Sequence, residues 1–311
     1  MITPASSSKG LVVMAFLGPT ASGKSELAMD WAQRFDCEIL CCDSMQVYKG
    51  LDIGTGKPTR EDQAAVPHHL LDVVTPDQEF HAGAWARQAR VLVEQILSRG
   101  RWPLVVGGTG LYFRALTQGL FDAPPADPEI RARHKAEADA EGVPMLHARL
   151  ATIDPEAAAR ISPNDLVRTS RALEVWEQTG VPITVLWKKA EPTVPVHAFR
   201  VLYDRDPDEL RQRIDRRVEA MMAAGFLAEV KGLRARGYSG ARALAGLGYK
   251  ELSQHLDGQL DLAAAVAEIK KNTAYYARRQ RTWFRKDAPE VRLSGSVDME
   301  ALTAMVKAWL A

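Results

Sequence analysis

The sequence has few cysteines and no long hydrophobic run. Its 3 cysteines, Cys37, Cys41 and Cys42, crowd into one short apolar stretch, so they cannot build a disulfide framework, and no nearby histidine completes a zinc set. The first apolar run, Leu11 to Leu17, ends in a glycine-rich turn and is far shorter than the roughly 20 residues of a membrane-spanning helix. We therefore expect buried, reduced cysteines and a cytoplasmic protein that has neither a signal peptide nor a membrane segment.

A strong net charge is also absent, since 40 Lys+Arg and 39 Asp+Glu leave the 311-residue chain at +1. An anionic partner must therefore be bound by local patches. The segment from Lys270 to Lys286 holds no acidic residue and interleaves its basic residues with aromatic ones. Within it Arg278, Arg281 and Arg285 share a helical face that can follow a phosphate backbone. The same pattern also fits an amphipathic helix with solvated arginines, and the residues alone leave both readings open.

The first 120 residues alternate apolar runs with helical patterns, which is typical of a parallel sheet wrapped by helices. Helices are predicted for Lys24 to Phe35 and for His81 to Ser98, whose apolar residues recur at helical spacing. The predicted strands are Leu11 to Leu17, Glu38 to Cys42, Leu70 to Val74 and Leu104 to Val106. The fold class that follows is α/β.

The character of the chain changes at Ala123. From there to about His197 the sequence reads as short helical segments divided by prolines, with no convincing strand. We predict a small all-helical domain, residues 125–197, inserted into a core formed by residues 1–124 and 198–311. The core resumes with a strand at Ala198 to Tyr203 and a helix that Asp206 caps, and further helices complete the chain.

The strongest motif follows the first predicted strand and fits G-x-x-x-x-G-K-[ST], the phosphate-binding P-loop. Backbone N–H groups of such a loop and of the next helix bind a diphosphate or triphosphate. Lys24 adds a positive charge, and the Ser25 hydroxyl is a candidate ligand for Mg²⁺. The candidate diphosphate-binding residues are Gly18, Pro19, Thr20, Ala21, Ser22, Gly23, Lys24 and Ser25.

A carboxylate that ATP-using P-loop enzymes often carry is missing here. In those enzymes an acidic residue at the end of a second apolar strand holds the metal, but the run Leu104 to Val106 continues into Gly107, Gly108 and Thr109. The candidate carboxylate is instead Asp43, which follows the strand predicted after the P-loop helix. Strand ends of an open parallel sheet line one crevice, so Asp43, Thr109 and the P-loop should converge. Asp43 then suits a general base, a helix cap or an outer ligand of Mg²⁺.

Two further pairs of residues invite a functional interpretation. Arg213 and Arg217 share one face of a predicted helix, from which they can grip a leaving diphosphate. His68 and His69 suggest a metal or an acid–base pair, but adjacent residues of an extended segment point in opposite directions. We therefore expect a structural role for the two histidines.

In combination these motifs resemble those of the bacterial tRNA dimethylallyltransferase family, also called tRNA isopentenyltransferases. The resemblance spans nearly the whole chain and rests on the P-loop and on residues 43–58, 67–70, 106–112, 171–175 and 276–283. It implies that the P-loop holds dimethylallyl diphosphate and not ATP, with Mg²⁺. It further implies that Asp43 is the general base, that Thr109 contacts the bridging oxygen of the leaving group, and that Lys24 stabilises the departing diphosphate.

The resemblance also implies the acceptor, the exocyclic amine (N6) of the adenine 3′ of the anticodon in tRNA. The anticodon stem-loop is then the macromolecular partner, with no obligate protein partner evident. Ser25 stands where threonine is frequent in the family, and the zinc finger of eukaryotic relatives is absent because no cysteine follows Cys42. The implied tRNA contacts are Asp43, Ser44, Met45, Gln46, Arg131, Val167, Arg168, Thr169, Ser170 and Arg171.

Three alternatives remain at this stage. A P-loop kinase of a small metabolite is disfavoured by the missing carboxylate after Val106 and by the basic segment near Arg278. An adenylate isopentenyltransferase acting on free AMP, ADP or ATP has no need of the inserted domain. A non-catalytic RNA-binding module leaves the intact P-loop unexplained.

Overall fold

The computed structural model describes residues 10–120, 124–188, 195–285 and 288–310, so Lys286 and the polar segment before Gly10 lie outside the described residues. The chain divides into two compact units. The first, Met1–Thr117 with Val194–Ala311, contains the sheet and is called the sheet unit below. The second, Gln118–Thr193, is called the helical unit.

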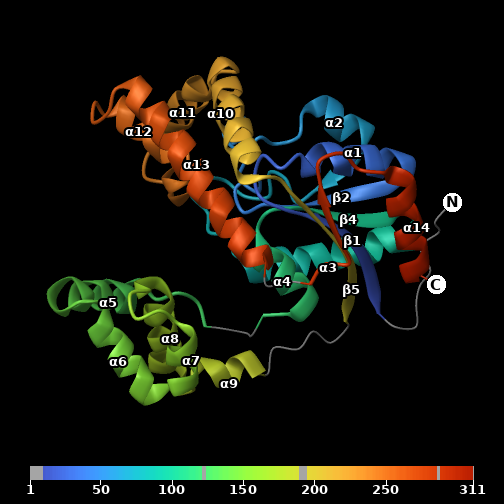
Figure 1. Cartoon of the computed structure of the whole chain (residues 1–311). Coiled ribbons are helices and arrows are strands. Elements are labelled where there is room, and N and C mark those ends of the chain that lie inside the picture. The colour runs from blue at the N-terminus through green and yellow to red at the C-terminus, as the bar shows by residue number, and fades with distance from the viewer. Residues whose placement is uncertain (1–9, 121–123, 189–194, 286–287, 311) are drawn as a thin grey trace. The chain divides into compact units, whose positions relative to one another are not determined.

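The sheet has six strands, all parallel, in the order β3-β2-β4-β1-β5-β6 (Figure 1). Because all the strands are parallel, each connection between consecutive strands must cross over the sheet, and the helices of these connections cover both faces. The strands are β1 (Leu11–Leu17), β2 (Cys37–Cys42), β3 (His68–His69), β4 (Trp102–Gly107), β5 (Val196–Asp204) and β6 (Val291–Ser294).

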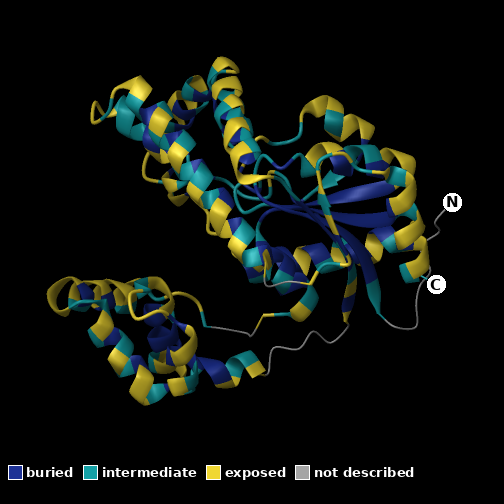
Figure 2. Ribbon diagram, in the orientation of Figure 1, coloured by how far each residue is buried: buried dark blue, intermediate teal, exposed yellow. Residues whose placement is uncertain are grey.

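The central strand β1 is apolar throughout because both of its faces are covered. Val13, Ala15 and Leu17 belong to one core, whereas Val12, Met14 and Phe16 belong to a second core on the opposite face. Figure 2 shows these central strands as the buried layer of the sheet unit. The second core is closed by helices α1 (Lys24–Arg34) and α14 (Met299–Leu310).

The first core is covered by helices that come from both halves of the sheet unit. Asp206 caps α10 as expected, since its side chain accepts from the N–H groups of Asp208 and Glu209. A π-helical turn, Arg234–Tyr238, and a 3-10 turn, Arg242–Ala245, separate α11 from α12. The helices on this face are α3 (Ala82–Ser98), α4 (Gly110–Gln118), α10 (Pro207–Ala223), α11 (Phe226–Leu233), α12 (Tyr249–Leu256) and α13 (Leu262–Arg285).

The helical unit has its own apolar core, which includes Leu146, Leu150 and Leu173. Its described residues form only helices and loops, and several of the helices begin at a proline or just after one, where a missing N–H costs nothing. The helices are α5 (Pro128–Glu141), α6 (Val143–Ile153), α7 (Pro155–Arg160), α8 (Leu166–Thr179) and α9 (Ile183–Lys188).

The parallel sheet and its helices confirm the predicted α/β fold, but three details were wrong. The strand expected at Leu70 to Val74 is instead the pair His68–His69, because Leu70 and Asp72 have positive φ angles, 65° and 53°, that break the extended backbone. Strand β5 begins at Val196, inside the range predicted for the insert. Strand β6 was not predicted, since Val291–Ser294 is short and half exposed.

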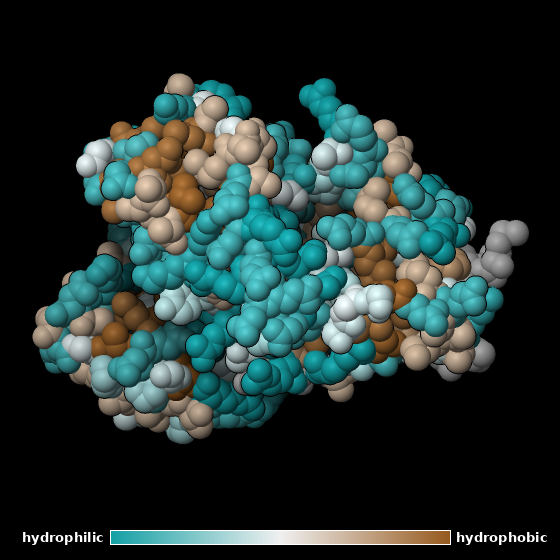
Figure 3. All heavy atoms as spheres, turned by 45° about the horizontal axis from the view of Figure 1, so that its top comes forward, coloured by the Kyte–Doolittle hydropathy of each residue, from teal (hydrophilic) through white to brown (hydrophobic). Residues whose placement is uncertain are grey.

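The face of the molecule in Figure 3 is mostly hydrophilic, with hydrophobic residues gathered in separate patches. Among the described helices, none combines the length and the apolar character that crossing a membrane requires.

A short helix, α2 (Arg60–Ala65), follows the loop after β2 and begins with a capping box formed by Thr59 and Asp62. The side chains of this helix contribute nothing to either core, since none of its residues is buried. Its cap fixes the end of the segment that lines one side of the site described next.

Candidate active site

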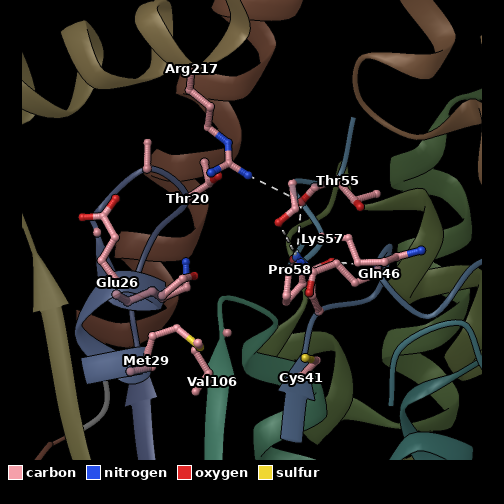
Figure 4. Close-up of a pocket in the computed structure, with 18 of the residues that line it drawn as sticks. Thr20, Glu26, Met29, Cys41, Gln46, Thr55, Lys57, Pro58, Val106 and Arg217 are labelled. Atoms are coloured by element: carbon pink, nitrogen blue, oxygen red, sulfur yellow. Dashed lines mark hydrogen bonds between the residues drawn. The ribbon is translucent and has the colours of Figure 1, made fainter. Parts of the chain in front are cut away.

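A cavity of about 680 Å³ opens beside the ends of β1, β2 and β4. Its walls are the P-loop, Asp43 after β2, the loop from Thr55 to Pro58, the arginines of α10, and α13. Figure 4 shows Arg217 reaching from α10 toward Thr55 across this space, with Thr20 on one side and Gln46 on the other. The ends of parallel strands thus form a crevice where such sheets bind ligands.

The P-loop is held open by backbone geometry that its glycines make possible. A Cβ on Gly18, whose φ is 156°, would lie 2.1 Å from the carbonyl oxygen of Tyr203. Gly23, with φ 97°, caps α1 without a side-chain acceptor, so the first N–H groups of the helix lack a capping partner. Open N–H groups at a helix N-terminus favour a bound anion.

Lys24 lines the cavity and donates through Nζ to the carbonyl oxygen of Pro19 at 3.1 Å. Burial, reinforced by the charge of Arg217, lowers the pKa of Lys24 to about 8, although Asp43 and Cys42 oppose the shift. The amine is held among groups that disfavour its charge. A bound diphosphate would add negative charge that favours the protonated amine.

The predicted arginines of α10 both reach the cavity, but they do different things. Arg217 donates to the carbonyl oxygen of Thr55 at 3.5 Å, and burial lowers its pKa although Asp43 and Glu26 oppose the shift. Arg213 donates through Nε to the carbonyl oxygen of Ala21 in the P-loop at 2.8 Å. Arg213 therefore shapes the loop as well as adding charge.

Arg205 was not foreseen from the sequence, yet it braces the same loop. Its Nε donates to the carbonyl oxygen of Ser22 at 2.8 Å, while its guanidinium also binds the hydroxyl of Tyr203 and the carboxylate of Glu209. Its place just after β5 was the available signal, since strand ends face the crevice. Together Arg205 and Arg213 fix two consecutive carbonyl groups of the P-loop.

The loop after β2 is anchored by a single carboxylate. Glu229 on α11 accepts from the backbone N–H groups of Asp52, Ile53 and Gly54 at 3.0, 2.7 and 3.2 Å, and from the hydroxyl of Tyr249 at 2.7 Å. This anchored loop continues into Thr55, whose carbonyl oxygen accepts from Arg217. The wall that holds Arg217 is therefore built on α11 and α12.

Asp43 lies at the end of β2, as predicted, and lines the cavity. Its Oδ1 accepts from the N–H groups of Met45 and Gln46 at 2.8 and 3.3 Å, which fixes the carboxylate by a local turn. Within the described part of the chain no donor contacts Oδ2. One oxygen thus orients the side chain, and the other is free to accept a proton.

Asp43 and Thr109 follow the ends of two neighbouring strands, β2 and β4, but Thr109 is not among the residues that line the cavity. Its Oγ1 accepts from the N–H of Ser44 at 3.1 Å, and its side chain is hydrogen-bonded to Tyr276, whose pKa burial raises. Tyr276 and Gln280, both on α13, line the cavity and were given no role by the sequence. The sequence marked residues 276–283 as a basic stretch and as part of the family resemblance, but it assigned no task to these two side chains.

The cavity collects many of the predicted ligand-binding residues, but not all of them. Five of the predicted residues in the P-loop and in the segment from Asp43 to Gln46 are not part of its lining: Gly18, Pro19, Ser22, Ser44 and Met45. The predicted residues that line it are Thr20, Ala21, Gly23, Lys24, Ser25, Asp43, Gln46, Arg213 and Arg217.

The three arginines of α13 do not form one free surface. Arg278 and Arg285 are exposed, whereas Arg281 pairs with Asp204 at 2.9 Å and is only partly exposed. The ion pair links α13 to the end of β5. Arg281 is therefore tied to the sheet unit itself, and only its neighbours are free to meet an external phosphate.

The predicted contacts in the helical unit also separate into two groups. Val167 is 80% exposed and Arg168 is exposed beside it, but Thr169 and Ser170 are 0% and 7% exposed. Burial of these two side chains does not fit direct contact with RNA.

Arg131 and Arg171 lie together in this unit because both bind the buried carboxylate of Glu174, at 3.0 and 2.6 Å. Each arginine keeps part of its surface exposed. Glu174 thus positions two cations side by side.

The two histidines are hydrogen-bonded within the sheet unit, and the three cysteines are buried. His69 Nε2 lies 2.6 Å from Glu38 Oε2, while Nδ1 of His68 bonds the carbonyl oxygen of Val66. His68 also lines the cavity, which a purely structural role did not anticipate. All three cysteines are free and buried, and burial raises the pKa of each thiol.

The family model and the similar proteins of known name agree on one family. Residues 46–287 match the model of the IPP transferase family. The chain is 47% identical to a tRNA dimethylallyltransferase of Sorangium cellulosum over 89% of this chain and 88% of that protein. It is also 47% identical to one of Anaeromyxobacter dehalogenans over 96% of this chain and 99% of that protein.

Two solved structures show the same fold. The tRNA isopentenylpyrophosphate transferase of Bacillus halodurans superposes with a TM-score of 0.70 at 36% identity, covering 97% of this chain and 96% of that one. A eukaryotic dimethylallyltransferase acting on tRNA gives a TM-score of 0.71 at 28% identity, covering 88% of this chain and 70% of that one. With its P-loop, its cationic cavity and these relatives, the chain belongs to the IPP transferase family.

Proposed function

We propose that this enzyme transfers the dimethylallyl group of dimethylallyl diphosphate to N6 of the adenine immediately 3′ of the anticodon in tRNA, releasing diphosphate. The observation that carries the proposal is that Lys24 and Asp43 line one cavity, so a diphosphate cradle and an oriented carboxylate face the same space. The relatives named tRNA dimethylallyltransferase support the same donor and acceptor.

The reaction needs two kinds of help that these residues can give. Attack of the adenine amine on the allylic carbon forms a carbon–nitrogen bond, breaks the carbon–oxygen bond, and leaves the electron pair on the diphosphate. P-loop N–H groups, Lys24 and Arg217 stabilise that developing charge. Thr109 lies behind the cavity lining, so its contact with the bridging oxygen is proposed from the resemblance alone.

Asp43 is the proposed general base. The exocyclic amine of adenine is a weak nucleophile because its lone pair is delocalised into the ring. Transfer of its proton to Oδ2 of Asp43 during attack should contribute about 10²- to 10⁴-fold. The adenine must leave its stack to reach the cavity, at a cost of a few kcal/mol, which a single-stranded loop base meets more easily than a paired one.

Mg²⁺ fits the residues present. Its usual protein partners are one or two oxygen ligands, with the remaining positions filled by water and phosphate oxygens. The Ser25 hydroxyl lines the cavity in the first turn of α1, and no cluster of three or more acidic, cysteine or histidine residues exists among the described residues. Ser25 would hold the ion, which would neutralise part of the diphosphate charge.

The proposed tRNA contacts are those the described surface leaves accessible. They are the segment from Asp43 to Gln46, the exposed Arg278 and Arg285 of α13, and, in the helical unit, Val167 and Arg168 with the paired Arg131 and Arg171. Recognition of unstacked loop bases and of backbone shape is expected, as is usual for RNA. We also propose a cytoplasmic location, because the proposed substrate is tRNA.

The test is an acceptor comparison. Labelled dimethylallyl diphosphate is incubated with hypomodified tRNA, with AMP, and with neither, and incorporation is counted. We expect label only in tRNA; label in AMP favours an adenylate isopentenyltransferase.

The alternative function, a kinase, is tested in the same preparation with labelled ATP. Efficient phosphate transfer from ATP by the wild-type protein would contradict the proposal.

The role of the P-loop is tested with Lys24→Ala. This variant should lose prenyl transfer while its tRNA affinity stays within a few-fold of the wild-type value, because tRNA binding draws on other basic surfaces.

A further inference from the structure

The side chain of Gln280 is buried between the two parts of the site that must act together. It is 6% exposed and lies midway along the C-terminal half of α13. Its Oε1 accepts from the backbone N–H of Thr20 in the P-loop at 2.8 Å, and its Nε2 donates to the carbonyl oxygen of Gly108 at 3.0 Å. Gly108 directly precedes Thr109.

The orientation of this amide is forced by its partners. A backbone N–H can only donate and a carbonyl oxygen can only accept, so Oε1 must face Thr20 and Nε2 must face Gly108. No other uncharged side chain of this length offers one acceptor and one donor in a fixed planar group. The fit is also close, because a Cβ on Gly108 would lie 2.1 Å from Nε2 of Gln280.

Gln280 belongs to a face of α13 that is built against this turn. Tyr276, one helical turn earlier, is hydrogen-bonded to the Thr109 side chain. Trp283, three residues later, packs on Gly110, where an added Cβ would lie 2.0 Å from its Nε1. The spacing of these residues places them on one side of the helix. The side that carries Arg278 and Arg285 is exposed.

We propose that Gln280 is a positioning residue that holds the diphosphate loop and the turn carrying Thr109 in register through the two hydrogen bonds of its side-chain amide. The inference rests on the proposed function for the identity of the reaction, but the two hydrogen bonds are independent of it. Gln280 borders the cavity, but both polar groups of its side chain are hydrogen-bonded to the backbone. It acts through Thr20, which lines the diphosphate cradle, and through Gly108, which fixes the position of Thr109.

The first experiment compares Gln280→Met with Thr273→Val. Methionine keeps the length of the side chain but neither donates nor accepts here. Thr273 is also buried on α13, and its hydroxyl bonds only the carbonyl oxygen of Ile269 in the same helix. We expect Q280M to lower kcat for the anticodon stem-loop by about 10- to 100-fold, the scale expected when a catalytic group is misplaced by an ångström.

Affinity for inorganic diphosphate is measured in parallel by calorimetry. Q280M should weaken it at least several-fold, whereas affinity for the stem-loop should stay within about twofold, because Arg278 and Arg285 are untouched. T273V should keep kcat and both affinities near wild-type values. If Q280M behaves like wild type, or if T273V loses as much activity as Q280M, then Gln280 has no specific positioning role.

Gln280→Glu adds a signature that a purely structural role would not give. When protonated, the introduced carboxyl group can accept from Thr20 and donate to Gly108, as the glutamine amide does, but when ionised it has no donor. The ratio of Q280E to wild-type kcat should therefore fall as the pH rises. Lys24, Asp43, Tyr276 and the α10 arginines are the same in both proteins, so their effects cancel to first order; a ratio that rises with pH would overturn the inference.

Failure of this inference is separable from failure of the proposed function. If the wild-type protein does not prenylate the stem-loop, the proposed function fails, and the diphosphate affinities of Q280M and T273V still test Gln280. If wild type transfers the prenyl group and Q280M matches it in kcat and diphosphate affinity, only the positioning role is lost.

Discussion

Diphosphate binding should depend on pH through Lys24. Burial and Arg217 lower the pKa of Lys24 to about 8, so in the empty site the amine is protonated in roughly nine of ten molecules at pH 7 and in roughly one of ten at pH 9. A bound diphosphate favours the charged amine, and above pH 8 binding must therefore take up a proton. The affinity that depends on Lys24 should fall about tenfold between pH 7 and pH 9.

The assay is calorimetric titration of a thiolodiphosphate analogue of dimethylallyl diphosphate, in which sulfur replaces the bridging oxygen. Lys24→Arg is the matched control, because arginine stays protonated throughout this range. Ionisation of the ligand affects both proteins equally, so the wild-type to K24R affinity ratio isolates Lys24. Buffers of different ionisation enthalpy should show proton uptake by wild type approaching one at pH 9. A ratio that stays constant within twofold from pH 7 to pH 9 would refute the reasoning.

Three further outcomes follow from the site. Asp43→Asn should lower turnover by about 10²-fold or more while preserving substrate affinity, since an asparagine oxygen still accepts from Met45 and Gln46; near-normal turnover in rapid-quench assays would leave Asp43 only a positioning role. Gly56→Ala should weaken diphosphate binding, because its Cβ would lie 2.0 Å from the Arg217 guanidinium at a φ of 58°, and unchanged calorimetric affinity would show that Arg217 does not grip the ligand. Replacing Arg278 and Arg285 by alanine should reduce the slope of log affinity against log salt by about 0.7 to 0.9 per lost phosphate contact, and an unchanged slope with the stem-loop would make that face a solvated surface.

The parts of the site that could be predicted from sequence are those carried by local pattern. The P-loop motif, the apolar run before it and the carboxylate after the next strand fixed the places of Lys24 and Asp43, because parallel strand ends must meet at one edge. The prediction of the α/β fold also rests on local pattern, the alternation of apolar runs with helical periodicity. The cap at Asp206 was equally local.

What escaped prediction depends on partners far away in the chain. Arg281 reads as a free cation until Asp204, 77 residues earlier, is found beside it. Gln280 reads as a polar residue among arginines, and only the fold brings it to Thr20, 260 residues away. The third strand was misplaced because positive φ angles at Leu70 and Asp72 leave no mark in an apolar run.

The central claim is that a prenyl group moves to one adenine of tRNA. Its most direct test is mass spectrometry of a synthetic anticodon stem-loop after incubation with enzyme, Mg²⁺ and dimethylallyl diphosphate. We expect one dimethylallyl group on N6 of the adenine immediately 3′ of the anticodon, and none when that adenine is replaced by guanine. Modification of a different nucleotide, or transfer that survives the change to guanine, would contradict the claim.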